Sequence, residues 1–104
     1  MKLSEIFKND LLYRQENLTK DECLDFIYGA LDDMLIAGDI DNSNDILGLL
    51  LPEELNTDNI IGILTITSNY KRYLPKRACF YTKSYIYLSK IHGDRASYIL
   101  KNLE

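Results

Sequence analysis

The sequence predicts an all-α fold: a single compact domain of four to six helices around a central helix over Pro75–His92. Three observations support this fold class. The 104 residues are 46% hydrophobic and 27% charged, which are the proportions of one ordinary soluble domain. Thr19 and Glu22 form a capping box at a helix start. Pro75 and Gly93 mark the start and the end of a long helix.

The first two helices are predicted from caps and from apolar periodicity. Ser4 can cap a short helix that carries the apolar residues of positions 6–12. The second helix starts at the Thr19 capping box and ends before Gly38. At 100° per residue one side of this helix is apolar, with Cys23, Leu24, Phe26, Ile27, Ala30, Leu31, Met34 and Leu35. The other side is acidic, with Asp21, Glu22, Asp25, Asp32 and Asp33.

The sequence predicts alternating turns and short helices in the middle of the chain. Apart from Ile40, residues 39–45 carry short polar side chains that compete for nearby backbone amides, so we expect turns and caps there. A short apolar helix over Ile46–Leu51 should follow. Pro52 ends it, and Pro52–Leu55 can open another helical turn.

The segment Ile60–Thr67 fits two structures. Five of its eight residues are apolar without a clear period, and β-branched residues favour a strand as well as a buried helix. We expect a helix, because the flanking caps are helical. The alternative is an α+β fold in which residues 60–67 pair with residues 80–89 in a hairpin.

The Pro75 helix is predicted to be the packing hub of the domain. Apolar side chains surround nearly all of it and leave one polar line of Lys76, Lys83 and Lys90, seven residues apart. Arg77 falls in the apolar part, so its burial would require a carboxylate partner or access to solvent. We expect the Thr19 helix to lay its apolar face against this hub. Residues 70–74 form a loop before the hub, and Asp94 caps a last short helix after it.

The charges are divided into two blocks along the chain. Residues 21–70 contain eleven Asp or Glu and no Lys or Arg, whereas residues 71–104 contain eight Lys or Arg and two acidic residues. The blocks can neutralise each other inside the fold, or the carboxylates can simply be helix caps and solvated faces. An outward-facing acidic surface would instead repel nucleic acid and attract a basic protein.

We expect a non-enzymatic cytoplasmic protein of the inhibitor or immunity type. Its acidic helical face would engage a partner with a basic surface, such as a nucleic-acid enzyme, by imitating the phosphate backbone. The helical wheel selects Asp21, Asp25, Asp32 and Asp33 as the protein-binding residues.

Two alternatives use other residues. The first is a nucleic-acid-binding domain, in which cations beside aromatic side chains contact phosphates and bases; its residues are Lys71, Arg72, Lys76 and Lys83. The overall acidity of the chain makes nucleic acid the weaker expectation. The second is a self-associating helical scaffold, for example a homodimer, that pairs through Tyr81, Tyr85 and Tyr87.

No catalytic, metal or cofactor motif is found. Residues 39–45 alternate oxygen ligands like a calcium loop, but the required Gly and the final Glu are replaced by Asn44 and Leu50. His92 is the only histidine, and along one helix it would lie about 20 Å from Cys79. We therefore expect no enzyme activity, no metal and no cofactor. We also expect no signal peptide and no membrane segment, and two reduced cysteines.

Four stretches resemble small helical proteins of bacteria and their phages. They are Leu35–Ile40, Leu49–Leu51, Leu64-Thr65-x-Thr67 and Leu74-Pro75-x-Arg77-x-x-Phe80. The resemblance implies helices, including a helix over Ile60–Thr67, and implies no particular function.

Overall fold

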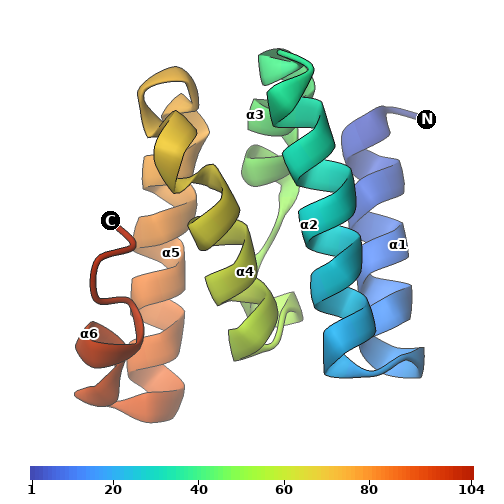
Figure 1. Ribbon diagram of the computed structural model, residues 1–104. Helices are drawn as coiled ribbons and strands as arrows, with labels where there is room; N and C mark the ends of the chain where they lie inside the picture. Colours follow the sequence, from blue (N-terminus) through green and yellow to red (C-terminus); the bar gives the residue numbers. More distant parts are fainter.

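The structure is a computed structural model that describes residues 1–104, and it contains helices and no strand. Its elements are α1 (Leu3–Asn17), α2 (Lys20–Ile36), α3 (Ile40–Leu49), the 3-10 helix η1 (Pro52–Glu54), α4 (Thr57–Thr67), the 3-10 helix η2 (Ser68–Tyr73), α5 (Pro75–His92) and α6 (Arg95–Ile99). The all-α prediction is confirmed. In Figure 1, α4 lies between α2 and α5, α1 lies on the far side of α2, and α6 lies beside α5.

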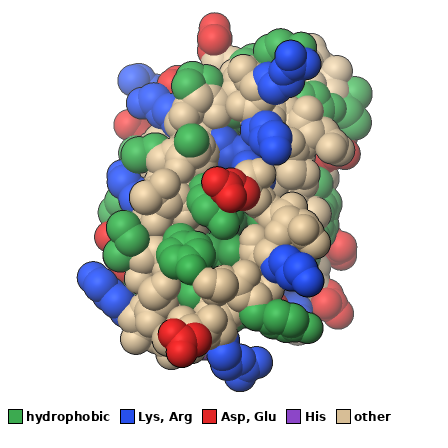
Figure 2. Space-filling model, turned by 90° about the vertical axis from the view of Figure 1, so that its left-hand side faces the viewer, with side chains coloured by type: hydrophobic (Ala, Val, Ile, Leu, Met, Phe, Trp, Pro, Cys, Tyr) green, Lys and Arg blue, Asp and Glu red, His purple; other side chains and the backbone are tan.

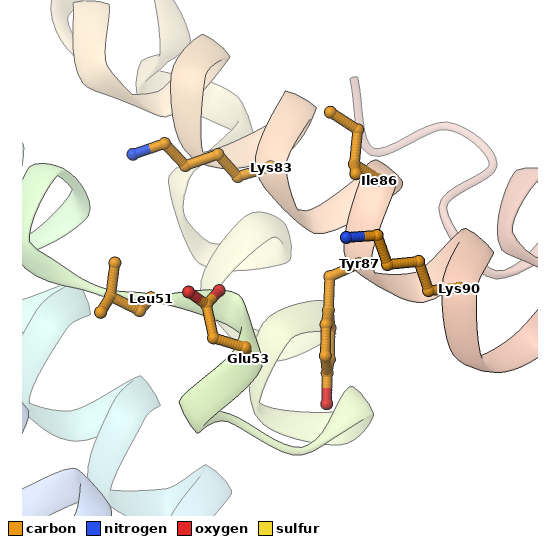
Figure 3. A pocket seen from close by; sticks show the side chains of 6 residues that line it. All are labelled: Leu51, Glu53, Lys83, Ile86, Tyr87 and Lys90. Carbon is orange, nitrogen blue, oxygen red and sulfur yellow. The ribbon is translucent and has the colours of Figure 1, made fainter.

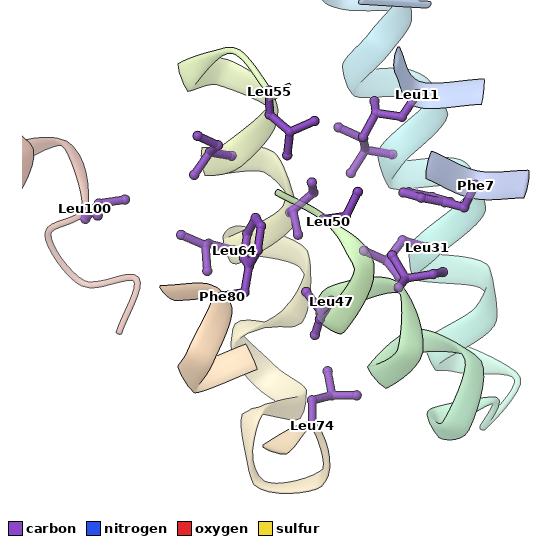
Figure 4. Packing of buried hydrophobic residues seen from close by; sticks show 14 of the residues in the cluster. Phe7, Leu11, Leu31, Leu47, Leu50, Leu55, Leu64, Leu74, Phe80 and Leu100 are labelled. Carbon is purple, nitrogen blue, oxygen red and sulfur yellow. The ribbon is translucent and has the colours of Figure 1, made fainter. Parts of the chain in front are cut away.

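One hydrophobic core joins these helices. It contains 17 buried side chains, among them Phe7 of α1, Leu31 of α2, Leu64 of α4 and Phe80 of α5 (Figure 4). Removing an aliphatic or aromatic side chain of this size from water contributes about 1.5–3 kcal/mol. The core therefore draws on every long helix.

The predicted signals at the ends of α2 and α5 are confirmed. The Thr19 hydroxyl accepts a hydrogen bond from the Glu22 backbone N–H at 3.3 Å, and the Glu22 carboxylate accepts one from the Thr19 N–H at 3.2 Å. Gly38 and Gly93 follow α2 and α5 with φ of +82° and +60°, a region that glycine enters at little cost. Gly38 and Gly93 therefore set where the two longest helices end.

The segment Ile60–Thr67 is helical, so the hairpin alternative is wrong. It lies within α4, which begins after Asn56, whose side chain accepts a hydrogen bond from the Asn59 N–H at 2.9 Å. Both Ile60 and Ile63 are fully buried. The residues expected as a loop before α5 are instead largely within the 3-10 helix η2.

Two helix starts differ from the predictions. The helix α3 begins at Ile40 instead of Ile46, because Asp39 is its N-cap and accepts a hydrogen bond from the Asn42 N–H at 3.3 Å. The polar residues that follow Asp39 are therefore helical. The helix α1 begins at Leu3, so Ser4 lies inside its first turn and is buried instead of capping it.

The helix α5 contacts more elements than any other helix, as expected of a hub: α3, α4, α6, η1 and η2. The expectation that the Thr19 helix packs on α5 is wrong. That helix, α2, packs mainly against α4, α1 and α3. Gly62 of α4 permits the close approach, since a Cβ there would lie 2.9 Å from the Leu24 Cδ2 atom.

Arg77 is buried without a carboxylate, contrary to the expected requirement for one or for solvent. Its side chain is 2% exposed. The guanidinium donates hydrogen bonds to the Thr67 hydroxyl at 2.8 Å and to the backbone carbonyls of Leu64 and Leu103 at 2.7 and 2.6 Å. Burial lowers the pKa of Arg77. Neutral oxygens, two at the C-terminal end of α4 and one at Leu103, therefore hold this cation in the core.

Two further expectations concern membranes and cysteines. None of the helices has both the length and the apolar character needed to cross a bilayer. Both cysteines are free thiols, Cys23 buried in α2 and Cys79 exposed on α5. Burial raises the pKa of the Cys23 thiol.

Candidate protein-binding surfaces

The four predicted carboxylates lie on the outer half of α2, and three of them form one stripe. Asp21, Asp25 and Asp33 are exposed and Asp32 is half-buried. At 100° per residue, Asp21, Asp25 and Asp32 fall within about 40° of one another. Asp33 lies beside this stripe, farther around the helix. We call these four residues the acidic face. The core-facing side of α2 is formed by Cys23, Ile27, Leu31 and Leu35.

The carboxylates of the acidic face have no cationic partner in the chain. The structure has two ion pairs, Lys8–Glu54 at 3.2 Å and Lys20–Asp58 at 3.3 Å. Neither involves a lysine or arginine of residues 71–104. The two charge blocks therefore do not neutralise each other by ion pairing inside the fold. Two other acidic residues stabilise helix starts: the Glu22 carboxylate accepts a hydrogen bond from the Thr19 N–H, and the Asp39 carboxylate accepts one from the Asn42 N–H.

The predicted line of lysines on α5 lies along a groove. We call Lys76, Lys83 and Lys90 the lysine row. One hollow of about 400 Å³ has Lys83 and Lys90 in its lining. A second hollow of about 380 Å³ is lined in part by Lys76 and Lys83. Because both are lined by Lys83, the hollows adjoin along α5 and are closed on the other side by α3 and η1.

The lining of the groove is mixed, with apolar side chains, the lysines and a single carboxylate. Leu51, Ile86 and Tyr87 line the first hollow, and Leu47 and Phe80 line the second. Figure 3 shows Lys83 and Lys90 projecting from α5 over the first hollow, with Glu53 of η1 between their ends and Tyr87 below them. No ion pair joins Glu53 to either lysine. The lysine row therefore leaves the groove with an excess of positive charge.

The residues of the nucleic-acid alternative are only partly brought together. Lys76 and Lys83 line the groove, whereas Lys71 and Arg72 belong to η2 and line none of the hollows. The Lys71 ammonium donates a hydrogen bond to the backbone carbonyl of Glu104 at 3.2 Å. Figure 2 shows the side of the molecule on which α5 and α6 lie, with lysine and arginine side chains scattered over it between hydrophobic and other surface.

The three tyrosines of the scaffold alternative do not form one face. Tyr81 and Tyr85 are neighbours, with ring centroids 6.4 Å apart, and the Tyr85 hydroxyl bonds to the Ser97 hydroxyl. Burial, with a smaller effect of the Glu104 carboxylate, raises the pKa of Tyr81. Tyr87 lies on another side of α5, in the groove beside η1.

The other candidate sites take simple structural roles. His92 is half-buried, and its Nε2 atom lies 3.1 Å from the Thr57 hydroxyl. Residues 40–45 of the calcium-like stretch are helical and belong to α3. No group of three or more His, Cys, Asp or Glu side chains is placed to hold a metal ion.

The groove itself was not predicted from the sequence. The seven-residue spacing of the lysines predicted that they share one line of α5, but not what lies opposite. What lies opposite is α3, where the Lys76 stem lies against Gly48: a Cβ at this glycine would lie 2.5 Å from the Lys76 Cδ atom. The lysine stem therefore passes directly over this glycine.

Comparison with protein-family models, with curated proteins and with solved structures finds no match to this chain.

Proposed function

We propose that this protein is a non-enzymatic binding module of the inhibitor or immunity type. Its acidic face on α2 engages the basic surface of a protein partner, such as the phosphate-binding groove of a nucleic-acid enzyme. One observation carries the proposal: Asp21, Asp25 and Asp32 share one stripe on the outer half of α2, Asp33 lies farther around the same half, and none of the four has an ion-pair partner in the chain.

The spacing of the acidic face suits a surface that binds phosphates. From Asp21 to Asp33 the helix rises about 18 Å and carries four charges outside the cap residue Glu22. One strand of B-DNA carries a phosphate about every 3.4 Å of axis, or roughly five over this distance. A basic groove would therefore meet a similar density of negative charge. Such complementarity raises the association rate and favours basic partners over acidic ones.

Charge reversal of the acidic face tests this function. The full-length protein is immobilised, and the proteins that it captures from a native lysate are identified by mass spectrometry. We expect the wild type to capture nucleic-acid enzymes that added duplex DNA releases. The double variant Asp25→Lys with Asp32→Lys should lose them, because its helix then repels a basic groove.

A matched variant controls for net charge. Asp41 and Asp45 are exposed on α3, four residues apart, and changing both to Lys alters the net charge by the same amount. This control should capture the same proteins as the wild type. Capture that is unchanged in the α2 variant, or that duplex DNA does not reduce, would overturn the proposed function.

Nucleic-acid binding is the second candidate function, and one observation favours it: Lys71, Arg72, Lys76 and Lys83 have no carboxylate partner within ion-pair distance. Fluorescence anisotropy with labelled duplex and single-stranded DNA separates the two functions. Binding that weakens steeply as salt rises would support this second candidate. The protein-binding function predicts no such complex.

A further inference from the structure

We propose that the groove along the lysine row is a docking site for the acidic face of a second copy of this chain. In this arrangement α2 of one copy lies along α5 of the next, and Asp25 and Asp32 pair with two lysines of the row. The docking rests on the proposed function in one respect, namely that the acidic face is a binding surface. The lysine row, which forms the other side of the contact, is an independent observation.

The two charged rows have the same period. Asp25 and Asp32 are seven residues apart, and so are Lys76, Lys83 and Lys90. On an α-helix seven residues rise about 10 Å and return to nearly the same direction. Two carboxylates on one helix therefore face two lysines on another without either backbone bending. Charges that repeat every seven residues select partners in this way in coiled coils.

The apolar parts of the two surfaces also correspond. Between and beyond its carboxylates, α2 exposes Tyr28 and Ile36, of which 40% and 69% are accessible to solvent. The groove offers the side chains of Ile86 and Tyr87 between Lys83 and Lys90. An amphipathic helix that lies in an apolar groove with charges at its edges is a common mode of recognition. Burying Tyr28 and Ile36 would add a hydrophobic contribution to the ion pairs.

The pairing has to form between copies and not within one. In a single chain α4 lies between α2 and α5 (Figure 1), and the main packing partners of α2 are α4, α1 and α3. The contact joins two different surfaces, so each added copy still presents one free acidic face and one free lysine row. Such a contact builds open chains instead of closed dimers, unless the rotation between copies closes a ring.

Reciprocal charge reversal tests the docking. Variant one carries Asp25→Lys and Asp32→Lys, and variant two carries Lys83→Asp and Lys90→Asp. Sedimentation velocity at low salt should show wild-type oligomers that grow with concentration and dissociate at high salt. Each variant alone should sediment as a monomer, because its two surfaces then have the same sign. An equimolar mixture should regain the oligomers, since every reversed surface meets an opposite one.

Two controls make the result specific. Circular dichroism and thermal melting should show that both variants keep the helical fold. The Asp10→Lys, Glu16→Lys protein changes the net charge by the same amount and should still self-associate, because both residues are exposed on α1 and line none of the hollows. A wild type that stays monomeric over the concentration series would overturn the docking. Oligomers that persist in either variant alone, or a mixture that stays monomeric, would also overturn it.

The test separates this docking from the proposed function. Variant two retains the acidic face, so it should still capture a basic partner from the lysate while it no longer self-associates. If the wild type does not self-associate but captures that partner, the docking alone fails. If reversal of Asp25 and Asp32 abolishes self-association but leaves capture unchanged, the proposed function alone fails. Salt-dependent binding of labelled DNA that requires Lys83 and Lys90, without self-association, would assign the row to nucleic acid and overturn the docking.

Discussion

Arg77 is the residue on which one end of the core depends. A buried guanidinium loses the stabilisation that water gives its charge, and here three neutral oxygens replace that water. Two of them belong to Leu64 and Thr67 in the last turn of α4, where the helix dipole places partial negative charge. The third is the carbonyl of Leu103. The side chain therefore ties the end of α4 to the segment that follows α6.

Replacing Arg77 should destabilise the fold in a graded way. Arg77→Ala leaves buried oxygens without donors and should lower the free energy of unfolding by about 2–4 kcal/mol. Arg77→Lys keeps the charge but lacks the planar fork, so we expect a smaller loss of about 1–2 kcal/mol. Urea unfolding followed by circular dichroism measures both. The exposed Lys101→Ala should change the value by less than about 0.5 kcal/mol, and an equally small effect of Arg77→Ala would contradict this role.

At the scale of single elements, local capping chemistry decided which predictions were correct. The Thr19–Glu22 capping box and the glycines at 38 and 93 depend only on residues close by in the chain. Their effect on the helix ends could therefore be predicted from the sequence alone. The start of α3 was missed because Asp39 and Ser43 fit a turn and a helix equally well. In the fold, Ser43 is fully buried and its hydroxyl donates to the Asp39 carbonyl, which is compatible with the helix.

Leu24 of α2 lies directly against Gly62 of α4, which has no side chain. Gly62→Val should lower the free energy of unfolding by about 1–3 kcal/mol, because the added methyl groups collide with Leu24. Gly29 is a matched control within α2, since a Cβ there meets no atom within 4 Å. Gly29→Ala should raise stability by up to about 1 kcal/mol. Thermal and urea unfolding of both variants check the pair, and a neutral Gly62→Val would contradict the close approach.

The candidate surfaces were predictable only as far as they lie on single helices. Asp21, Asp25 and Asp32 share one side of α2, and the three lysines share one line of α5, because the helical period alone fixes both. Which helices pack together depends on contacts between distant residues. For that reason the expected packing of α2 on α5 was wrong, and neither the groove nor the neutral partners of Arg77 could be predicted.

At the scale of the whole molecule, the main feature is that opposite charges remain apart. The chain has a formal net charge of −4, yet only two ion pairs form, and none includes the acidic face or the lysine row. Exposed ion pairs contribute little to stability, so the fold loses little by leaving these charges unpaired. They remain available to other molecules.

This separation predicts retention on ion exchangers of both signs. At pH 7 and low salt the protein should bind an anion exchanger through the acidic face and, despite its net charge, a cation exchanger through the lysine row. Reversing Asp25 and Asp32 should advance elution from the first column. Reversing Lys83 and Lys90 should advance elution from the second. A wild type that passes unretained through the cation exchanger would show that the row is too weak to act as a surface.

Because α2 and α5 lie on opposite sides of α4, their unpaired charges give the molecule a permanent electric dipole moment that runs across its helices. A strongly charged molecule exerts a torque on this dipole, so the protein turns toward that molecule as the two diffuse together, before they are in contact. A cationic body then meets α2 first and an anionic one meets α5 first, so orientation is selected during diffusion, ahead of any short-range contact.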